Sequence, residues 1–173
     1  MITLDDLRVI CKHTKTGRLS LFVEPLNEAM LEFDIDNVER ETHFIAQVAH
    51  ESGGFNYVRE LASGEAYEGR ADLGNTEPGD GARFRGRGCI QITGRGNYSA
   101  CGTALGADFV SEPELLEQPI FATRSAAWFW KEHGLNELAD KGDARTITKR
   151  INGGLNGYQD RLSYLALAQE RLA

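Results

Sequence analysis

The sequence predicts a predominantly helical α+β fold, built as one domain over residues 1–173. Apolar residues recur at helical spacing in residues 4–52 and again from residue 119 to the C-terminus. Between these segments lies a stretch rich in Gly, charged residues and Tyr, which is typical of loops. The composition, with 41% hydrophobic and 26% charged residues, is that of an ordinary globular domain.

Three helices are expected in the first 52 residues. Thr3 and Asp6 have the spacing of a capping box, and Pro25 is well placed at the start of a second helix. Asn37 is expected to cap a third helix over residues 38–52, which Gly53-Gly54 ends. The apolar positions of these helices are Leu4, Leu7 and Ile10, then Leu26, Ala29, Met30 and Phe33, then Val38, Phe44, Ile45, Val48 and Ala49.

The middle of the chain predicts an insert of loops with short strands. Residues 56–88 have weak periodicity and many glycines. Residues 89–93 alternate, so we expect a half-buried strand in which Ile90 and Ile92 face the core and Gln91 and Thr93 face away from it.

Three further helices are expected after this insert. Pro119 can open a helix that runs to about His133, where Gly134 ends it. Asp143 can cap a second helix that ends near Asn152, and the last helix is expected over residues 158–172.

Charge and motif content exclude several classes of function. The net charge of −7 argues against a general nucleic-acid binder, and no apolar run is long enough for membrane insertion. The chain has no phosphate-binding loop, HExxH motif or zinc spacing, so we expect neither a cofactor nor a metal. Cys11, Cys89 and Cys101 fit no disulfide framework and are expected to be reduced, buried thiols. Because the N-terminus has no signal-peptide pattern, we expect synthesis in the cytoplasm.

Two carboxylates have contrasting predicted surroundings. Glu51 falls on the last turn of the third helix, where the negative end of the helix dipole favours the protonated form that a general acid needs. Glu60 falls in the loop region, where we expect it to be more solvated and ionised. Such a pair fits the acid and base of a glycosidase. Spacing alone also allows an exposed helix-end residue and an ordinary surface acid.

A second group of residues carries amides and aromatic rings, the groups that bind sugars. The alternative for the asparagines beside glycines is ordinary turn chemistry. The group comprises Gln91, Thr93, Asn97, Tyr98, Asn152, Asn156 and Tyr158.

Five sequence blocks, in order, resemble glycoside hydrolase family 19, which includes chitinases and phage endolysins. The blocks begin with His50-Glu51-Ser52-Gly53-Gly54-Phe55 and with residues 84–93 followed by Asn97-Tyr98. They continue with residues 125–130, Ile151-Asn152-Gly153-Gly154 and Asp160-Arg161. The resemblance covers residues 38–170, and residues 1–37 are expected to complete the helical core.

The resemblance implies a lysozyme-like two-lobed fold, with the strand and loop insert beside a cleft, and hydrolysis with inversion at the anomeric carbon. It makes Glu51 the general acid, Glu60 the general base and Thr93 a residue that positions water. It also implies that Arg161 lies at the catalytic centre and orients a carboxylate. The substrate-binding positions that it implies are Gln91, Asn97, Tyr98, Asn152 and Arg161.

The chain is most similar to the endolysin-like branch, because it is short and has only nine residues from Glu51 to Glu60. We therefore expect a monomeric enzyme, without a separate wall-binding module, that cleaves β-1,4 bonds of bacterial peptidoglycan after release through a holin-permeabilised membrane. One alternative is a chitinase that hydrolyses polymers of N-acetylglucosamine. Another is a catalytically inactive protein that binds amino sugars.

Overall fold

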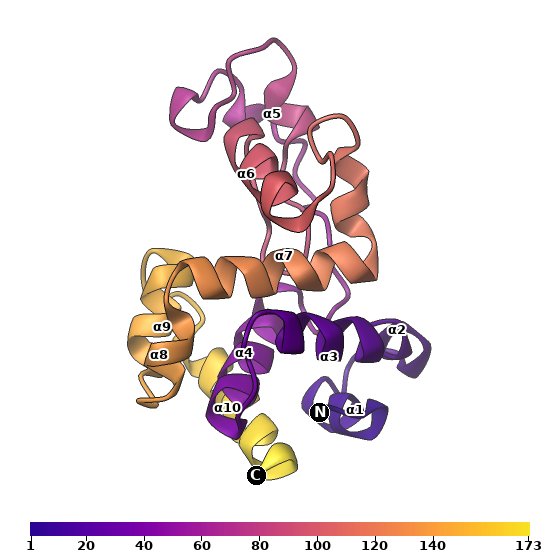
Figure 1. Cartoon of the computed structure of the whole chain (residues 1–173), viewed down its shortest axis with the longest axis vertical. Helices are drawn as coiled ribbons and strands as arrows, with labels where there is room; N and C mark the ends of the chain where they lie inside the picture. The colour runs from indigo at the N-terminus through magenta and orange to yellow at the C-terminus, as the bar shows by residue number, and fades with distance from the viewer.

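The computed structural model describes residues 1–173. Its regular secondary structure is helical, and one long helix lies between its two lobes (Figure 1). The helices are α1 (Leu4–Ile10), α2 (Thr16–Ser20), α3 (Val23–Glu32), α4 (Val38–Glu51), α5 (Asp80–Arg83), α6 (Arg95–Leu105), α7 (Pro119–Glu132), α8 (Leu135–Ala139), α9 (Ala144–Asn152) and α10 (Tyr158–Leu172). Three short 3₁₀ helices are η1 (Glu65–Tyr67), η2 (Ala71–Leu73) and η3 (Pro113–Glu117).

Local capping explains where several of these helices begin. The Thr3 side chain accepts a hydrogen bond from the backbone of Asp6, and the Asp6 carboxylate accepts one from the backbone of Thr3. Asn37 caps α4 through the backbone of Arg40, and Asp143 caps α9 through the backbone of Thr146. The predicted starts of α1, α4 and α9 are therefore confirmed, and so are those of α7 and α10.

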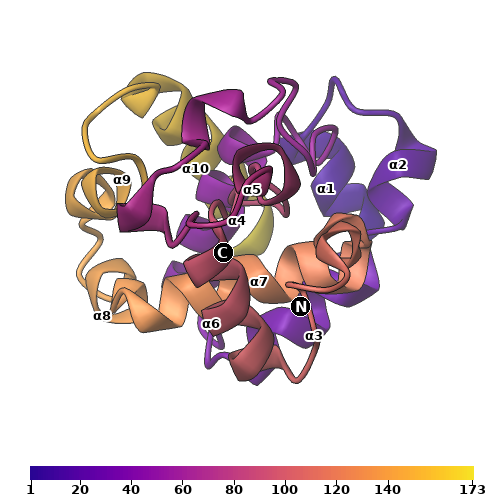
Figure 2. The same cartoon turned by 90° about the horizontal axis from the view of Figure 1, so that it is seen from above.

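The larger lobe is built on α4. Helix α10 packs along α4, and α3 packs against α7. Viewed from above, α8–α10 and α1–α3 lie on opposite sides of α4 and α7 (Figure 2). Phe44 of α4 and Trp130 of α7 meet edge to face with ring centroids 5.4 Å apart, and both side chains are fully buried. Among the apolar residues of α4 that were expected in the core, Val38 is instead exposed, because it lies on the outer side of the first turn.

The smaller lobe contains residues 56–117 and lies above α7 in Figure 1. The prediction of a strand over residues 89–93 is wrong. Residues 88–91 form a tight turn, closed by an isolated antiparallel bridge between Arg87 and Ile92. Gln91 adopts a left-handed backbone conformation with φ of 60°, which a strand cannot contain.

Helix α6 follows this turn directly, although the sequence analysis placed no helix there. Its apolar positions are few and it contains Gly96 and Gly102, so its helical periodicity is weak. Packing explains why Gly102 is present, because a Cβ atom there would lie 2.5 Å from the backbone oxygen of Ala107. The short helices α2, α5 and α8 were not predicted either.

All three cysteines are free and buried. Burial raises the pKa of Cys11, Cys89 and Cys101 to about 12, so none is ionised near neutral pH. These thiols pack in the apolar core and do not act as nucleophiles. No helix of the chain combines the length and the apolar character that crossing a bilayer requires.

Asp140 joins the end of α8 to the start of α4 and makes stability depend on pH. Its carboxylate accepts hydrogen bonds from Arg40 Nε at 2.8 Å, Arg40 Nη2 at 2.7 Å and Asn37 Nδ2 at 3.0 Å. The hydrogen bonds from Arg40, and then that from Asn37, lower the pKa of Asp140 from 3.8 to about 2. The stabilisation is therefore complete above the unfolded pKa and is lost as the pH falls through the folded value.

We expect Asp140→Asn to lower the free energy of unfolding near neutral pH by about 0.5 kcal/mol, since the pair is partly exposed and screened. The difference from wild type should shrink as the pH falls from about 4 to about 2. Thermal unfolding across this pH range measures it. Glu24→Gln, which removes an exposed and unpaired acid, is the control, and a pH-independent difference would contradict the prediction.

Candidate active site

Glu51 is the last residue of α4, and its side chain is 20% exposed. The helix stops there because Ser52 leaves the helical conformation and Gly53 and Gly54 both adopt positive φ. Glu51 Oε1 accepts a hydrogen bond of 2.5 Å from Nη2 of Arg161 on α10. Oε2 of Glu51 has no hydrogen-bond partner and is not among the buried atoms. One oxygen of the carboxyl group is thus fixed and the other is open to solvent.

Arg161 is only 2% exposed, so its guanidinium lies inside the protein. Nη1 donates to Gln47 Oε1 at 2.6 Å, and Nε makes a long contact of 3.4 Å with the backbone oxygen of Asn156. The prediction that Arg161 contacts the sugar is therefore wrong, because its guanidinium is buried and binds Glu51 and Gln47. The structure instead supports the expectation that Arg161 orients a carboxylate.

A second polar contact between α4 and α10 lies next to the first. His50 Nδ1 lies 2.6 Å from Asp160 Oδ2, so two neighbouring residues of α4 pair with two neighbouring residues of α10. Gly157 lets the chain pass close to the imidazole, because a Cβ there would lie 2.3 Å from His50 Cε1. The sequence analysis missed this contact, although the adjacency of Asp160 to Arg161 and of His50 to Glu51 is a visible signal.

Glu60 lies on the loop that follows α4 and is held there by residues near Gly86. Its backbone N–H donates to the Gly86 carbonyl at 2.9 Å. Its side-chain Oε2 accepts from the Gly86 N–H at 3.1 Å and from the Tyr67 hydroxyl at 3.1 Å. Oε1 is buried and has no partner. The expectation that Glu60 is well solvated is therefore wrong, because the loop folds back and covers the carboxylate.

Tyr67 is a site residue that the sequence analysis missed. Burial, and then the hydrogen bond to Glu60, raise the pKa of Tyr67, so the hydroxyl keeps its proton and remains a donor. No local pattern marks Tyr67, because its contact with Glu60 depends on how the loop folds.

Gly86 brings Glu60 and Gln91 together. A Cβ atom at Gly86 would lie 2.8 Å from Glu60 Oε2 and 2.8 Å from Gln91 Oε1. Gln91 donates from Nε2 to the Gly88 carbonyl at 2.9 Å, and this leaves its Oε1 directed toward Gly86. The absence of a side chain at residue 86 thus allows an amide oxygen and a carboxylate oxygen to approach the same backbone position.

Three of the predicted residues, Gln91, Thr93 and Asn97, line a single hollow of about 290 Å³. Its remaining lining is apolar and aromatic: Leu73, Ile90, Ile92, Trp128, Phe129 and His133. The rings of Phe129 and His133 stack with centroids 3.8 Å apart. Amides beside flat rings are the groups that bind a pyranose, and Gln91 links this hollow to Glu60 through Gly86.

Thr93 and Asn97 are fixed by backbone contacts within this wall. Thr93 Oγ1 donates to the Gln91 carbonyl at 3.0 Å, which leaves the hydroxyl oxygen able to accept a hydrogen bond. Asn97 Nδ2 donates to the Thr93 carbonyl at 2.8 Å. The turn that replaces the expected strand therefore places Gln91, Thr93 and Asn97 side by side.

Tyr98 and Asn152 do not join these residues. Tyr98 is fully buried, with its hydroxyl donating to the Arg85 carbonyl at 2.5 Å and accepting from Arg87 Nη1 at 3.0 Å. The expectation of a substrate contact is therefore wrong for Tyr98, because its position on the inner side of α6 makes it a core residue. Asn152 ends α9, is exposed and makes no side-chain hydrogen bond.

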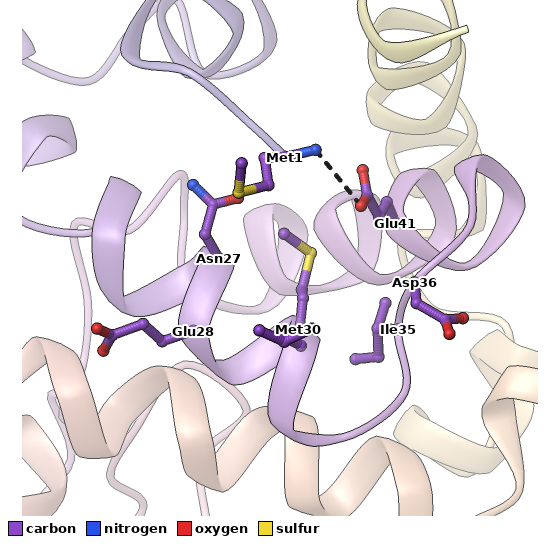
Figure 3. Close-up of a pocket in the computed structure, with 8 residues that line it drawn as sticks. Met1, Asn27, Glu28, Met30, Ile35, Asp36 and Glu41 are labelled. Carbon is purple, nitrogen blue, oxygen red and sulfur yellow. Dashed lines mark ion pairs between the residues drawn. The ribbon is translucent and has the colours of Figure 1, made fainter.

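A larger hollow of about 400 Å³ lies elsewhere, between α3 and the start of α4 (Figure 3). Met30 and Ile35 form part of its apolar lining, and the Met1 ammonium lies 3.6 Å from Glu41 at its edge. None of the predicted site residues lines this hollow, so it is separate from the candidate active site. No group of three or more His, Cys, Asp or Glu side chains is arranged to hold a metal ion.

Comparison with known proteins shows to which family the chain is related. Residues 39–145 match the family model described as chitinase class I, that of glycoside hydrolase family 19. A glycosyl hydrolase family 19 domain-containing protein of Haemophilus influenzae is 35% identical, over 72% of this chain and 76% of that protein. An endochitinase of Arabidopsis thaliana is 38% identical over 64% of this chain, but the match spans only 38% of the plant protein.

Solved structures show the same fold. Chitinase C from Streptomyces griseus superimposes with a TM-score of 0.81 at 21% identity, covering 99% of this chain and 76% of that one. A family 19, class IV chitinase from Zea mays gives a TM-score of 0.76 at 23% identity, covering 99% and 92%. The family match over residues 39–145, together with the Haemophilus relative, establishes that this chain belongs to glycoside hydrolase family 19.

Proposed function

We propose that this glycosidase cleaves β-1,4 bonds between the amino sugars of bacterial peptidoglycan, with inversion at the anomeric carbon. One observation supports an acid–base mechanism above the others. Glu51 and Glu60 each have one carboxyl oxygen bound by the protein and one without a partner, and Gly86 brings Glu60 close to Gln91 of the amide-lined and aromatic-lined hollow. A general acid or base is fixed by one oxygen and transfers a proton through the other. The unpartnered oxygen of Glu51 is not buried, whereas Glu60 Oε1 is buried, so the covering loop must move for water to reach Glu60.

In the proposed reaction, Glu51 gives its proton to the glycosidic oxygen as the bond from that oxygen to the anomeric carbon breaks. A water molecule forms a new bond to the anomeric carbon from the opposite side and gives its proton to Glu60. Inversion requires room for that water, typically about 6.5–9.5 Å between the carboxyl groups. Arg161 stabilises the carboxylate that forms on Glu51 because its charge already contacts Oε1.

Thr93 and the hollow position the reactants. The Thr93 hydroxyl donates to the Gln91 carbonyl, so its oxygen can accept a hydrogen bond from the attacking water. Gln91 and Asn97 offer amides to the sugar, and Trp128 and Phe129 offer ring faces. Asn152, at the exposed end of α9, completes the proposed substrate-binding residues if the polymer extends past the hollow.

The choice of peptidoglycan rests on the short separation of the two glutamates along the sequence. The matches to the plant endochitinases span less than half of those proteins. Glu60 follows Glu51 by only nine positions in the sequence. Compact loops leave the cleft open to a cross-linked polymer. A monomeric endolysin that reaches the cell wall after holin-dependent release is consistent with this substrate.

Chitin is the second candidate substrate. It is supported by the relatives named as endochitinases and by the structural match to chitinases. Both polymers present β-1,4-linked amino sugars, and they differ chiefly in the lactyl group of muramic acid. An inactive amino-sugar-binding protein is less well supported, because sugar binding alone does not need two carboxyl groups that each have one oxygen without a partner.

Digestion of purified peptidoglycan, followed by borohydride reduction and mass spectrometry, tests the proposal. We expect reduced muramic acid or reduced glucosamine at new chain ends, and Glu51→Gln should lower turnover by about 1,000-fold or more while binding is retained. Cleavage of chitin oligomers alone would move the substrate to chitin. Turnover by Glu51→Gln at the wild-type rate would refute its assignment as the general acid.

Gly86→Ala tests the base side of the site. Because the added Cβ would lie 2.8 Å from the flexible ends of Glu60 and Gln91, the side chains should move and the fold should persist. We expect activity to fall by about tenfold or more, since a shift of 1 Å in a reacting group has effects of this size. The melting temperature should change little.

The matched control for this variant is Gly17→Ala. Gly17 lies in a helix, and a Cβ added there would have no heavy atom within 4 Å, so activity should be unchanged and stability should rise by up to about 1 kcal/mol. Wild-type activity in Gly86→Ala would show that Glu60 does not need its present position.

A further inference from the structure

We propose that Gln47 and Thr148 are positioning residues for the catalytic centre. They form a buried hydrogen-bonded chain that fixes the Arg161 guanidinium and, through it, the Glu51 carboxyl group. The inference rests on the proposed role of Glu51 as general acid. Neither Gln47 nor Thr148 was singled out by the sequence analysis.

The first link of this chain lies along one face of α4. Gln47 and Glu51 are four residues apart, so their side chains project from the same side of the helix. Arg161 Nη1 donates to Gln47 Oε1 at 2.6 Å, and Nη2 donates to Glu51 Oε1 at 2.5 Å. The planar guanidinium therefore bridges two successive turns of α4, and Gln47 sets its position along the helix.

The second link fixes which way the Gln47 amide points. Gln47 Nε2 donates to Thr148 Oγ1 at 3.2 Å, and Thr148 Oγ1 donates to the Ala144 carbonyl of its own helix at 2.9 Å. Because the hydroxyl proton of Thr148 is already used, its oxygen serves as the acceptor. A flipped Gln47 would direct its NH₂ group at the guanidinium, so helix α9 holds the amide oxygen toward Arg161.

Burial indicates that the hydrogen-bonded residues Gln47, Thr148 and Arg161 act through Glu51 and do not contact the substrate. Gln47, Thr148 and Arg161 are each 2% exposed or less, whereas Glu51 is half-buried at the open end of the chain. Without Gln47, Arg161 would keep Glu51 and only the 3.4 Å contact with the Asn156 carbonyl. The guanidinium could then move, and Glu51 Oε1 would move with it.

Two charged residues of α10 pair with Glu51 or with its neighbour on α4. They are Arg161, which contacts Glu51, and Asp160, which pairs with His50 of α4 at 2.6 Å. From helix α9, the uncharged Thr148 contacts Gln47. On the opposite side, Glu60 is bound by Tyr67 and Gly86. A new carboxylate at residue 47 would therefore affect Glu51 mainly by competing with it for the positive charge of Arg161.

Two substitutions of Gln47 give different expected results, measured on whichever polymer the wild type cleaves. Gln47→Met keeps the length but removes both hydrogen bonds, and kcat should fall by about tenfold with KM within about twofold. Gln47→Glu adds an anion that competes for Arg161. Glu51 should then hold its proton more tightly, and the alkaline limb of the kcat/KM profile should move up by about half a pH unit or more.

Thr148 supplies a second test if a Gln47 variant does not fold. Thr148→Val should lower kcat in the same way by a smaller factor, and Thr148→Ser, which keeps the hydroxyl, should restore it. Thr123→Val is the matched control, because Thr123 is equally buried but bonds only to backbone oxygens far from the site. NMR of the Arg161 guanidinium resonances provides a readout that does not need turnover: they should be resolved in wild type and averaged in Gln47→Met and Thr148→Val.

The outcomes separate the two proposals. If folded Gln47→Met keeps kcat within about twofold of wild type and Gln47→Glu leaves the alkaline limb in place, the positioning role is refuted while Glu51 stands as the acid. If Glu51→Gln turns over normally, the acid assignment fails. The NMR measurement then still decides whether Gln47 and Thr148 fix Arg161.

Discussion

A guanidinium buried between two helices is the constraint on which the site depends. A positive charge removed from water must be paired and hydrogen-bonded, and Arg161 satisfies this with one carboxylate, one amide oxygen and a weak backbone contact. These partners come from α4 and from the loop before α10, so they fix how the two helices align. The same requirement fixes the last carboxyl group of α4, the proposed proton donor.

The second carboxyl group is held by different means. Glu51 lies on a helix of 14 residues, whereas Glu60 lies on a loop and takes its position from Gly86 and Tyr67. The helix provides rigidity through its own hydrogen bonds, and the loop obtains it from contacts with distant residues. The proposed acid and the proposed base are thus held in position by two different kinds of contact.

The sequence was sufficient to predict features that depend on neighbouring residues. The caps at Thr3, Asn37 and Asp143, and the glycines after Glu51, mark helix ends directly, and Glu51 could be located from them. The turn at residues 88–91 could not be predicted, because alternating Ile90 and Ile92 fit a strand equally well and only the left-handed Gln91 distinguishes the two. The contact of Tyr67 with Glu60 and the burial of Tyr98 could not be predicted for a related reason, because tertiary packing decides both.

Helix α7 has a mechanical consequence for the whole molecule. Its 14 residues pack against α3 and α4 of the larger lobe and against α6 and η3 of the smaller one, and its backbone accepts a hydrogen bond from Cys89 at Ala122. The lobes are therefore joined by a rigid rod of about 21 Å instead of a flexible linker. Closing the cleft like a jaw would require this rod to bend. Recognition of a polymer must then rely on a shape that exists before the polymer arrives, with adjustment confined to surface loops.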